Sequence, residues 1–310
     1  MNYKPILIVP GETKSIFFEI FFKSIESKKY NSGLILIYNK KKLDKEIKRF
    51  KFKQNIELLN INKVNLKNIK KNKIYLINVK KQNPKNYVLD CFDVAFKLIK
   101  SGFTNKLING PIDKSKTLKK KYLGITEYIS KKFNKKEFAM LIYNEKLSVS
   151  PITTHLPLKL VTKKISKKII IEKVNIINDF YKKFLKFKPR IAIVGLNPHC
   201  ESVHNFNEDQ KILLPAIKSL KKKINVKGPF PADTLFLKKN RENYDVIIGM
   251  YHDQVLTPIK TLFEYDAINI TLGLPLLRVS PDHGPNKKMI GKNKSSPVSL
   301  IKALSFLDKR

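Results

Sequence analysis

The sequence predicts an α/β protein built around a largely parallel sheet. Short apolar runs alternate along the chain with longer amphipathic segments, and this alternation is typical of strands joined by crossover helices. The chain carries no internal repeat and no linker rich in Gly, Pro or Ser. Its 310 residues are enough to bury a large core in one large or two medium domains.

Each predicted element rests on its hydrophobic pattern. Strands are expected at residues 4–10, 33–38, 56–59, 74–79, 106–109, 138–143, 147–152, 190–195, 246–250, 267–271 and 276–279. Helices are expected at residues 15–27, in a Lys-rich stretch ending near residue 50, and at 86–100, 124–133, 166–186, 208–222, 233–239 and 297–307. Thr126 and Asp233 are expected to cap two of these helices, because short polar side chains accept hydrogen bonds from first-turn amides. Residues 60–73 have the weakest pattern and are expected to form a loop.

The chain is strongly basic, with a formal net charge of +38 at pH 7. A charge of this size suggests nucleic acid or an anionic membrane as a partner. However, only five of the 63 basic residues are arginines, and the lysines are spread along the whole chain. Because arginine makes the paired hydrogen bonds that recognise phosphates and bases, the composition argues against an evolved nucleic-acid surface. A basic nucleic-acid-binding protein stays as an alternative, and weak, salt-sensitive binding is expected from charge alone.

Hydropathy and the first residues predict a cytoplasmic protein. The apolar runs are short and interrupted by lysine, so none is expected to cross a bilayer. The start of the chain lacks the apolar core of a signal peptide. The two cysteines, Cys91 and Cys200, form neither a disulfide framework nor a zinc motif. Glycine-rich dinucleotide and phosphate-binding signatures are also absent, so any NAD must bind by another geometry.

Three of the predicted strands end beside a histidine: residues 147–152 lead to His155, residues 190–195 to His199 and residues 246–250 to His252. If these strands are parallel neighbours, the three imidazoles would meet at the sheet edge where α/β proteins bind ligands. Three imidazoles with an open fourth position suit a catalytic divalent metal. The alternative is that each is an ordinary surface or hydrogen-bonded histidine, since their separations form no local metal motif.

Four further side chains are candidates for the chemistry. Asp253 follows His252 and could orient that imidazole, with an exposed salt bridge as the alternative. Arg278 stands out in an arginine-poor chain and could grip a carboxylate or phosphate, with a structural salt bridge as the alternative. Lys260 could hold the same kind of group. Cys200 lacks a clear base partner and is interpreted as an inert thiol.

Taken together, these motifs resemble the family of 4-hydroxythreonine-4-phosphate dehydrogenases, NAD-dependent enzymes of pyridoxal phosphate biosynthesis. The matching stretches occur in the family's order within residues 109–284. They are NGPIDK, ITEYI, TTHLPL, GLNPH, GPFPADTLF, MYHDQVLTPIK and NITLGLPLLRVSPDHG. No single stretch is specific, whereas the ordered set is.

The resemblance implies a two-subdomain α/β/α architecture similar to the isocitrate and isopropylmalate dehydrogenases, with the active site in the cleft between the domains. We expect a first domain at residues 1–124 and 281–310 and a second at 125–280. The resemblance also implies a homodimer and NAD or NADP bound through loops. A divalent metal such as Zn, Mg or Co is expected on His155, His199 and His252. Substrate contacts are expected from Thr126, Lys260, Asn269 and Arg278, and catalytic roles from Lys260 and Asp253.

The implied reaction is oxidation of 4-phosphooxy-threonine and loss of carbon dioxide to give 3-amino-2-oxopropyl phosphate in vitamin B6 biosynthesis. The chain departs from the family's pattern at two places. Its usual His-Thr-Glu is Ile125-Thr126-Glu127 here, so one substrate-binding imidazole is lost, and Lys114 is a candidate to compensate. The glycine-rich opening is reduced to a stretch that keeps Gly11 and Glu12. A related activity on threonate or erythronate 4-phosphate, or a catalytically silent relative, are the alternatives.

Overall fold

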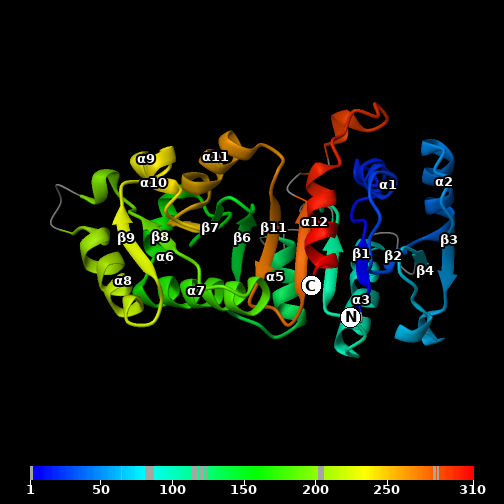
Figure 1. The fold of residues 1–310 in the computed structure, drawn as a ribbon, viewed down its shortest axis with the longest axis horizontal. Coiled ribbons are helices and arrows are strands. Elements are labelled where there is room, and N and C mark those ends of the chain that lie inside the picture. Colours follow the sequence, from blue (N-terminus) through cyan, green and yellow to red (C-terminus); the bar gives the residue numbers. More distant parts are fainter. Residues whose placement is uncertain are drawn as a thin grey trace. The chain divides into compact units, whose positions relative to one another are not determined.

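The computed structural model describes residues 3–63, 65–80, 87–113, 117–118, 122, 124–201, 206–281, 284 and 286–310. The chain divides into two compact units, shown in Figure 1. Unit 1 consists of Met1–Phe133 and Leu274–Arg310, and unit 2 of Asn134–Gly273. Residues 125–133 and 274–280, which the sequence prediction assigned to the second domain, therefore lie in unit 1.

Unit 1 contains a parallel sheet with the strand order β3-β4-β2-β1-β5-β12. The strands are β1 (Ile6–Val9), β2 (Leu34–Tyr38), β3 (Ile56–Leu59), β4 (Ile74–Asn78), β5 (Lys106–Asn109) and β12 (Leu277–Pro281). The strands β1, β2 and β5 are buried along their whole length. Burial on both faces explains why β1 and β2 are almost entirely apolar in sequence.

The helices of unit 1 alternate with these strands. They are α1 (Phe17–Ser27), α2 (Lys40–Phe50), α3 (Tyr87–Lys100), α5 (Ile125–Lys132) and α12 (Val298–Asp308). Helix α3 packs on β1 and β2, and α12 packs on β12, β5, β1 and α1. Residues 60–73, expected as a loop, contain two short 3₁₀ turns, Ile61–Lys63 and Leu66–Asn68.

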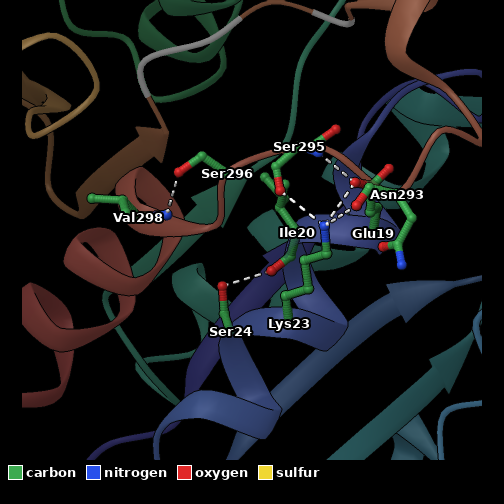
Figure 2. Close-up of polar contacts among 8 residues, drawn as sticks. All are labelled: Glu19, Ile20, Lys23, Ser24, Asn293, Ser295, Ser296 and Val298. Atoms are coloured by element: carbon green, nitrogen blue, oxygen red, sulfur yellow. Dashed lines mark hydrogen bonds and ion pairs between the residues drawn. The ribbon is translucent and has the colours of Figure 1, made fainter.

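A buried ion pair fastens the segment before α12 to helix α1 (Figure 2). Glu19 Oε1 accepts hydrogen bonds from Lys23 Nζ at 3.0 Å and from the Ser295 amide at 2.6 Å. The same ammonium donates to the carbonyl oxygens of Asn293 and Ser295 at 2.9 and 3.1 Å. Because the Glu19 side chain is only 1% exposed, removal of Lys23 would leave a buried carboxylate with one fewer donor.

Unit 2 contains a mixed sheet with the strand order β11-β6-β7-β10-β8-β9. The strands are β6 (Ala139–Tyr143), β7 (Ser148–Pro151), β8 (Ile191–Val194), β9 (Val226–Phe230), β10 (Val246–Gly249) and β11 (Ile268–Leu272). Strands β7, β10, β8 and β9 run parallel, whereas β6 is antiparallel to both β7 and β11. The predicted, largely parallel α/β sheet is therefore confirmed.

The helices of unit 2 are α6 (Val161–Lys164), α7 (Lys167–Phe180), α8 (Leu214–Lys221), α9 (Ala232–Leu235), α10 (Lys238–Arg241) and α11 (His252–Phe263). Ser166 caps α7 through a hydrogen bond from the Ile169 amide to its hydroxyl, at 3.3 Å. π-helical turns follow α7 (Tyr181–Leu185) and precede α8 (Asp209–Leu213). Among the helices of the described residues, none combines the length and apolar character that a bilayer span requires.

Both predicted helix caps are wrong. Gly124 occupies the cap of α5, and Thr126 lies inside the first turn. Pro231 occupies the cap of α9, and Asp233 is the second residue of that helix, after Ala232. Thr126 instead accepts a hydrogen bond from a distant side chain, so a tertiary contact overrides the local capping preference.

Candidate active site

Strands β7, β10 and β8, which precede the three candidate histidines, are parallel neighbours in the sheet of unit 2. Gly249 of β10 pairs with Pro151 of β7, and Ile248 of β10 pairs with Ile193 of β8. Their carboxyl ends therefore lie along one edge of the sheet, where ligands of α/β proteins bind. The arrangement of the strands agrees with the condition set from the sequence.

His155 and His252 lie side by side at this edge. Their ring centroids are 5.8 Å apart and the rings are tilted by 37°. His155 follows β7 in an exposed loop, whereas His252 is the first residue of α11 and is half-buried. Helix α11, which the sequence analysis did not predict, begins at this histidine, so the backbone of His252 is held by helical geometry.

Asp253 lies next to the His252 ring. Its Oδ1 is 2.7 Å from His252 Nδ1, and its side chain is 80% exposed. When Nδ1 carries the proton, it donates a hydrogen bond to the carboxylate, and Nε2 is left with a lone pair that can bind a metal. Asp253 is therefore placed to orient the His252 ring.

His199 lies in a strained loop after β8. His199 and the following Cys200 have φ angles of 54° and 61°, a left-handed conformation that costs free energy for residues other than glycine. The loop is shaped by the fully buried Asp209, which accepts hydrogen bonds from the amides of Leu196 and Asn197 at 2.7 and 3.0 Å. The His199 side chain is exposed.

Cys200, interpreted from the sequence as an inert thiol, is buried beside this loop. Burial raises the pKa of Cys200 to about 11, with Asp209 acting in the same direction. The thiolate is the reactive form of cysteine, and at neutral pH almost all of this side chain is protonated. Cys200 is therefore unsuited to act as a nucleophile.

The donor side chains at this edge suit a divalent first-row metal in their chemistry. Two imidazoles lie next to each other, and a carboxylate supports one of them through its second nitrogen. Within the part of the chain that the structure describes, no three His, Cys, Asp or Glu side chains gather closely enough to hold an ion. The structure thus brings together His155 and His252 of the predicted set and leaves His199 on the neighbouring loop of the same sheet edge.

A buried arginine forms a second cluster, in unit 1. Arg278 of β12 is 3% exposed, and its Nε donates to Asn109 Oδ1 at 2.7 Å. Its Nη1 donates to Thr126 Oγ1 at 2.9 Å. Burial lowers the pKa of Arg278 to about 10, while Glu127 acts in the opposite direction. The guanidinium therefore remains a cation at neutral pH in a setting with low exposure to water.

Asn109 was missed by sequence reasoning. It is the last residue of β5, it is 2% exposed, and its Nδ2 donates to the Gly110 carbonyl at 2.8 Å. Its position at the carboxyl end of a predicted parallel strand was the available signal. In a chain rich in asparagine that signal does not single it out, because its role depends on the partner at Arg278.

The remaining predicted residues are divided between the units. Lys260 is half-buried on α11 and Asn269 is half-buried on β11, both in unit 2 with the histidines. The Asn269 Oδ1 is buried and accepts no hydrogen bond from the described residues. Ile125 is the first residue of α5 in unit 1, directly before Thr126. Lys114, the candidate to replace the lost imidazole, lies outside the described residues, as do His204 and His283.

Gly11 and Glu12 join two loops at the carboxyl ends of β1 and β5, which are adjacent parallel strands. Glu12 Oε1 accepts hydrogen bonds from the Asp113 amide at 3.1 Å and from the Thr117 hydroxyl. Gly11 has a φ of 79°, and a Cβ there would collide with the Pro111 carbonyl oxygen. The two residues kept from the family's opening therefore hold the loop that follows Asn109.

The chain matches the family model described as "Pyridoxal phosphate biosynthetic protein PdxA" over residues 27–307. It is 47% identical over 189 residues to a 4-hydroxythreonine-4-phosphate dehydrogenase from Sulfurihydrogenibium sp., which covers 60% of this chain and 58% of that protein. The chain thus spans little more than half the length of this curated relative. The crystal structure of 4-hydroxythreonine-4-phosphate dehydrogenase from Klebsiella pneumoniae is similar with a TM-score of 0.83 and 25% identity, covering 98% of this chain and 97% of that chain.

A more distant likeness concerns the fold alone. Isocitrate dehydrogenase from Methylococcus capsulatus is similar with a TM-score of 0.51 at 10% identity, over 98% of this chain and 84% of that chain. The predicted fold, similar to the isocitrate dehydrogenases, is confirmed.

Proposed function

Because the chain belongs to the family of the pyridoxal phosphate biosynthetic protein PdxA, we propose that it is a metal-dependent oxidoreductase acting on 4-phosphooxy-threonine. The proposed reaction oxidises the secondary alcohol with NAD or NADP as acceptor, and the resulting β-keto acid loses carbon dioxide to give 3-amino-2-oxopropyl phosphate. The observation that carries the proposal is the adjacent His155 and His252 pair with Asp253 behind it. Imidazole donors at a ligand-binding sheet edge suit a metal ion that polarises a substrate hydroxyl.

We propose His155, His252 and His199 as the residues that would hold a divalent ion such as Zn, Mg or Co. The chemistry that such an ion supplies is polarisation of a substrate oxygen, so that a hydroxyl loses its proton more readily. Asp253 orients His252 through the 2.7 Å contact at Nδ1. His199, with an exposed side chain on a loop at the same sheet edge, is proposed to complete the set.

Arg278 and Thr126 are proposed to bind the anionic part of the substrate. A guanidinium held by two neutral acceptors keeps its positive charge while its orientation is fixed, which favours binding of phosphate or carboxylate. Lys260 and Asn269 are proposed as further substrate contacts, and Lys260 as a proton donor. We further propose a cytoplasmic homodimer.

The test is an assay with purified, metal-loaded protein. We expect reduction of NAD with 4-phosphooxy-threonine and loss of this activity when a chelator removes the metal. Absence of turnover with NAD and with NADP, in protein shown to hold the metal, would contradict the assignment.

Ile125 favours a second candidate substrate class. Ile125 is the first residue of α5 and lies directly before Thr126. It stands where the family has a histidine, and its side chain neither carries charge nor donates a hydrogen bond. Threonate or erythronate 4-phosphate, which lack the amino group, should therefore be compared in the same assay. Higher kcat/KM with these sugar acids would favour the second class, whereas a large gain with 4-phosphooxy-threonine in Ile125→His would indicate the first.

A further inference from the structure

The side-chain amide of Gln254 bridges the ends of two histidine-bearing strands in unit 2. Its Oε1 accepts a hydrogen bond from the Met250 amide at 2.7 Å, and its Nε2 donates to the Gly195 carbonyl at 2.7 Å. Met250 follows β10 and Gly195 follows β8. The backbone pairing of these strands ends at Ile248 and Ile193. The Gln254 amide therefore links the two chains beyond the last paired residues.

A glycine lies near each end of this bridge. A Cβ at Gly249 would lie 2.9 Å from Gln254 Oε1 and 2.5 Å from Val255 Cγ1. A Cβ at Gly195 would lie 2.6 Å from Cys200 Sγ and 2.9 Å from Asp209 Oδ1. Strand β10 thus ends in a glycine where Gln254 approaches the backbone, and β8 is followed by a glycine where Asp209 approaches it.

Met250 also connects β10 to the loop of His155. The Thr153 hydroxyl and the Thr153 amide both donate to the Met250 carbonyl, at 2.7 and 3.1 Å. The peptide groups on either side of Met250 are therefore held by Gln254 and by Thr153. Through these contacts the loops of His155, His199 and His252 meet at one buried residue, since Met250 is 0% exposed.

Helix capping accounts for only half of the Gln254 contacts. A glutamine in the first turn often accepts a hydrogen bond from an amide preceding the helix, and the bond from Met250 fits this role. The second bond, to Gly195, crosses to β8 and contributes nothing to the helix end. It fixes the start of the loop in which His199 adopts its left-handed conformation, and such strain persists only where surrounding contacts determine it.

We propose that Gln254 is a positioning residue that sets the His199 loop against the His155 and His252 pair, so that the three imidazoles can bind one metal ion. The inference rests on the metal dependence in the proposed function. It adds that the site is organised by a side-chain amide outside the ligand set. Gln254→Glu tests this directly, because glutamate keeps the acceptor for Met250 and loses the donor to Gly195.

The first measurement uses metal-free protein and the thiol of Cys200 as a reporter of the His199 loop. Cys200 and Cys91 are both buried, so alkylation followed by peptide mass spectrometry compares a thiol in this loop with one in unit 1. We expect Gln254→Glu to speed alkylation of Cys200 about tenfold or more, as loss of a buried hydrogen bond permits, and to leave Cys91 unchanged. Equal acceleration of both thiols would show a general loss of stability and overturn the proposal.

The second measurement is titration with Co²⁺, whose visible absorption depends on its ligands. We expect Gln254→Glu to weaken Co²⁺ binding about 10- to 100-fold, the usual effect of removing a group that orients metal ligands. Gln210→Glu is the matched control, because it makes the same chemical change at an exposed residue beside Asp209. Equal affinities in the two variants would also overturn the proposal.

A double-mutant cycle separates positioning from general support of the fold. If Gln254 acts through the His199 loop, Gln254→Glu should add little to the loss of Co²⁺ affinity in a His199→Ala background. Full additivity would contradict this route. Wild-type protein that binds Co²⁺ and fails to oxidise any tested substrate would refute the proposed reaction and leave this inference standing, whereas wild-type protein that binds no divalent ion would refute both.

Discussion

The arginine cluster of unit 1 and the histidine edge of unit 2 prepare for a ligand in opposite ways. Arg278 is buried, and its guanidinium already donates to Asn109 and Thr126. His155 and His199 are exposed, and their loops are fixed through the backbone. The difference teaches that the cluster holding a permanent charge is preorganised at the side chain, whereas the edge proposed to bind a metal ion is preorganised at the loop.

The physical reason lies in desolvation. A cation removed from water needs acceptors at once, because a buried charge without partners is strongly destabilising. A neutral imidazole has no such requirement, and water can solvate its nitrogens until an ion binds. We therefore expect a substitution in the arginine cluster to weaken substrate binding more than a single substitution at the histidine edge does.

The largest effect is expected from Arg278→Met. The variant removes the buried cation and leaves Asn109 Oδ1 without its donor. The value of kcat/KM for the phosphorylated substrate should therefore fall roughly a hundredfold or more, which corresponds to a loss of about 3 kcal/mol of binding free energy. Steady-state kinetics measures this change. Co²⁺ affinity should stay within about twofold, because the histidines belong to the other unit.

Arg190→Met is the control for loss of an arginine. Arg190 lies in unit 2 with a side chain that is 48% exposed, and it pairs with Asp245 at 2.9 Å. Exposed pairs contribute little, so kinetics should be nearly unchanged. A loss of Co²⁺ binding in Arg278→Met would show that the two clusters are not independent and would break the comparison.

An intermediate effect is expected from removal of the imidazoles themselves. His252→Ala should weaken Co²⁺ binding about a hundredfold, at the upper end of the effect of groups that only orient ligands. His199→Ala should weaken it less, because the exposed His199 ring must first be brought to the adjacent pair. Competition titration with a coloured chelator gives both affinities, and a larger loss for His199→Ala would show that the third loop dominates the site.

The sequence predicted the strands closely and the side-chain partners poorly. Strands β3 and β5 have the predicted bounds, because short apolar runs between polar stretches mark strands in an α/β chain. Strand β9 was missed, since Gly228 and Pro229 within it read as breakers. The sequence alone placed each histidine after a predicted strand. Whether those strands are parallel neighbours could be seen only in the fold.

The failures at the site share one cause, which is long-range pairing. Thr126 was predicted as a cap from its neighbours, and it instead binds Arg278, 152 positions along the chain. Gln254 reads as an ordinary first-turn glutamine, and its second bond reaches Gly195 on another strand. Local patterns determine which residues form helices and strands, but they carry no information about which distant groups meet.

The smallest effect is expected from Asp253→Asn. The Asp253 side chain is 80% exposed, and asparagine can still accept a hydrogen bond from His252 Nδ1, so water and the amide together replace most of what the carboxylate provides. We expect Co²⁺ affinity to fall about tenfold or less and kcat/KM to follow it at limiting metal, with recovery when the metal saturates. If activity stays lost at saturating Co²⁺, Asp253 takes part in the chemistry directly, as a catalytic residue, and the histidine edge is more than a holder for the ion. That result would make the histidine edge resemble the arginine cluster, where the side chains themselves are expected to contact the substrate.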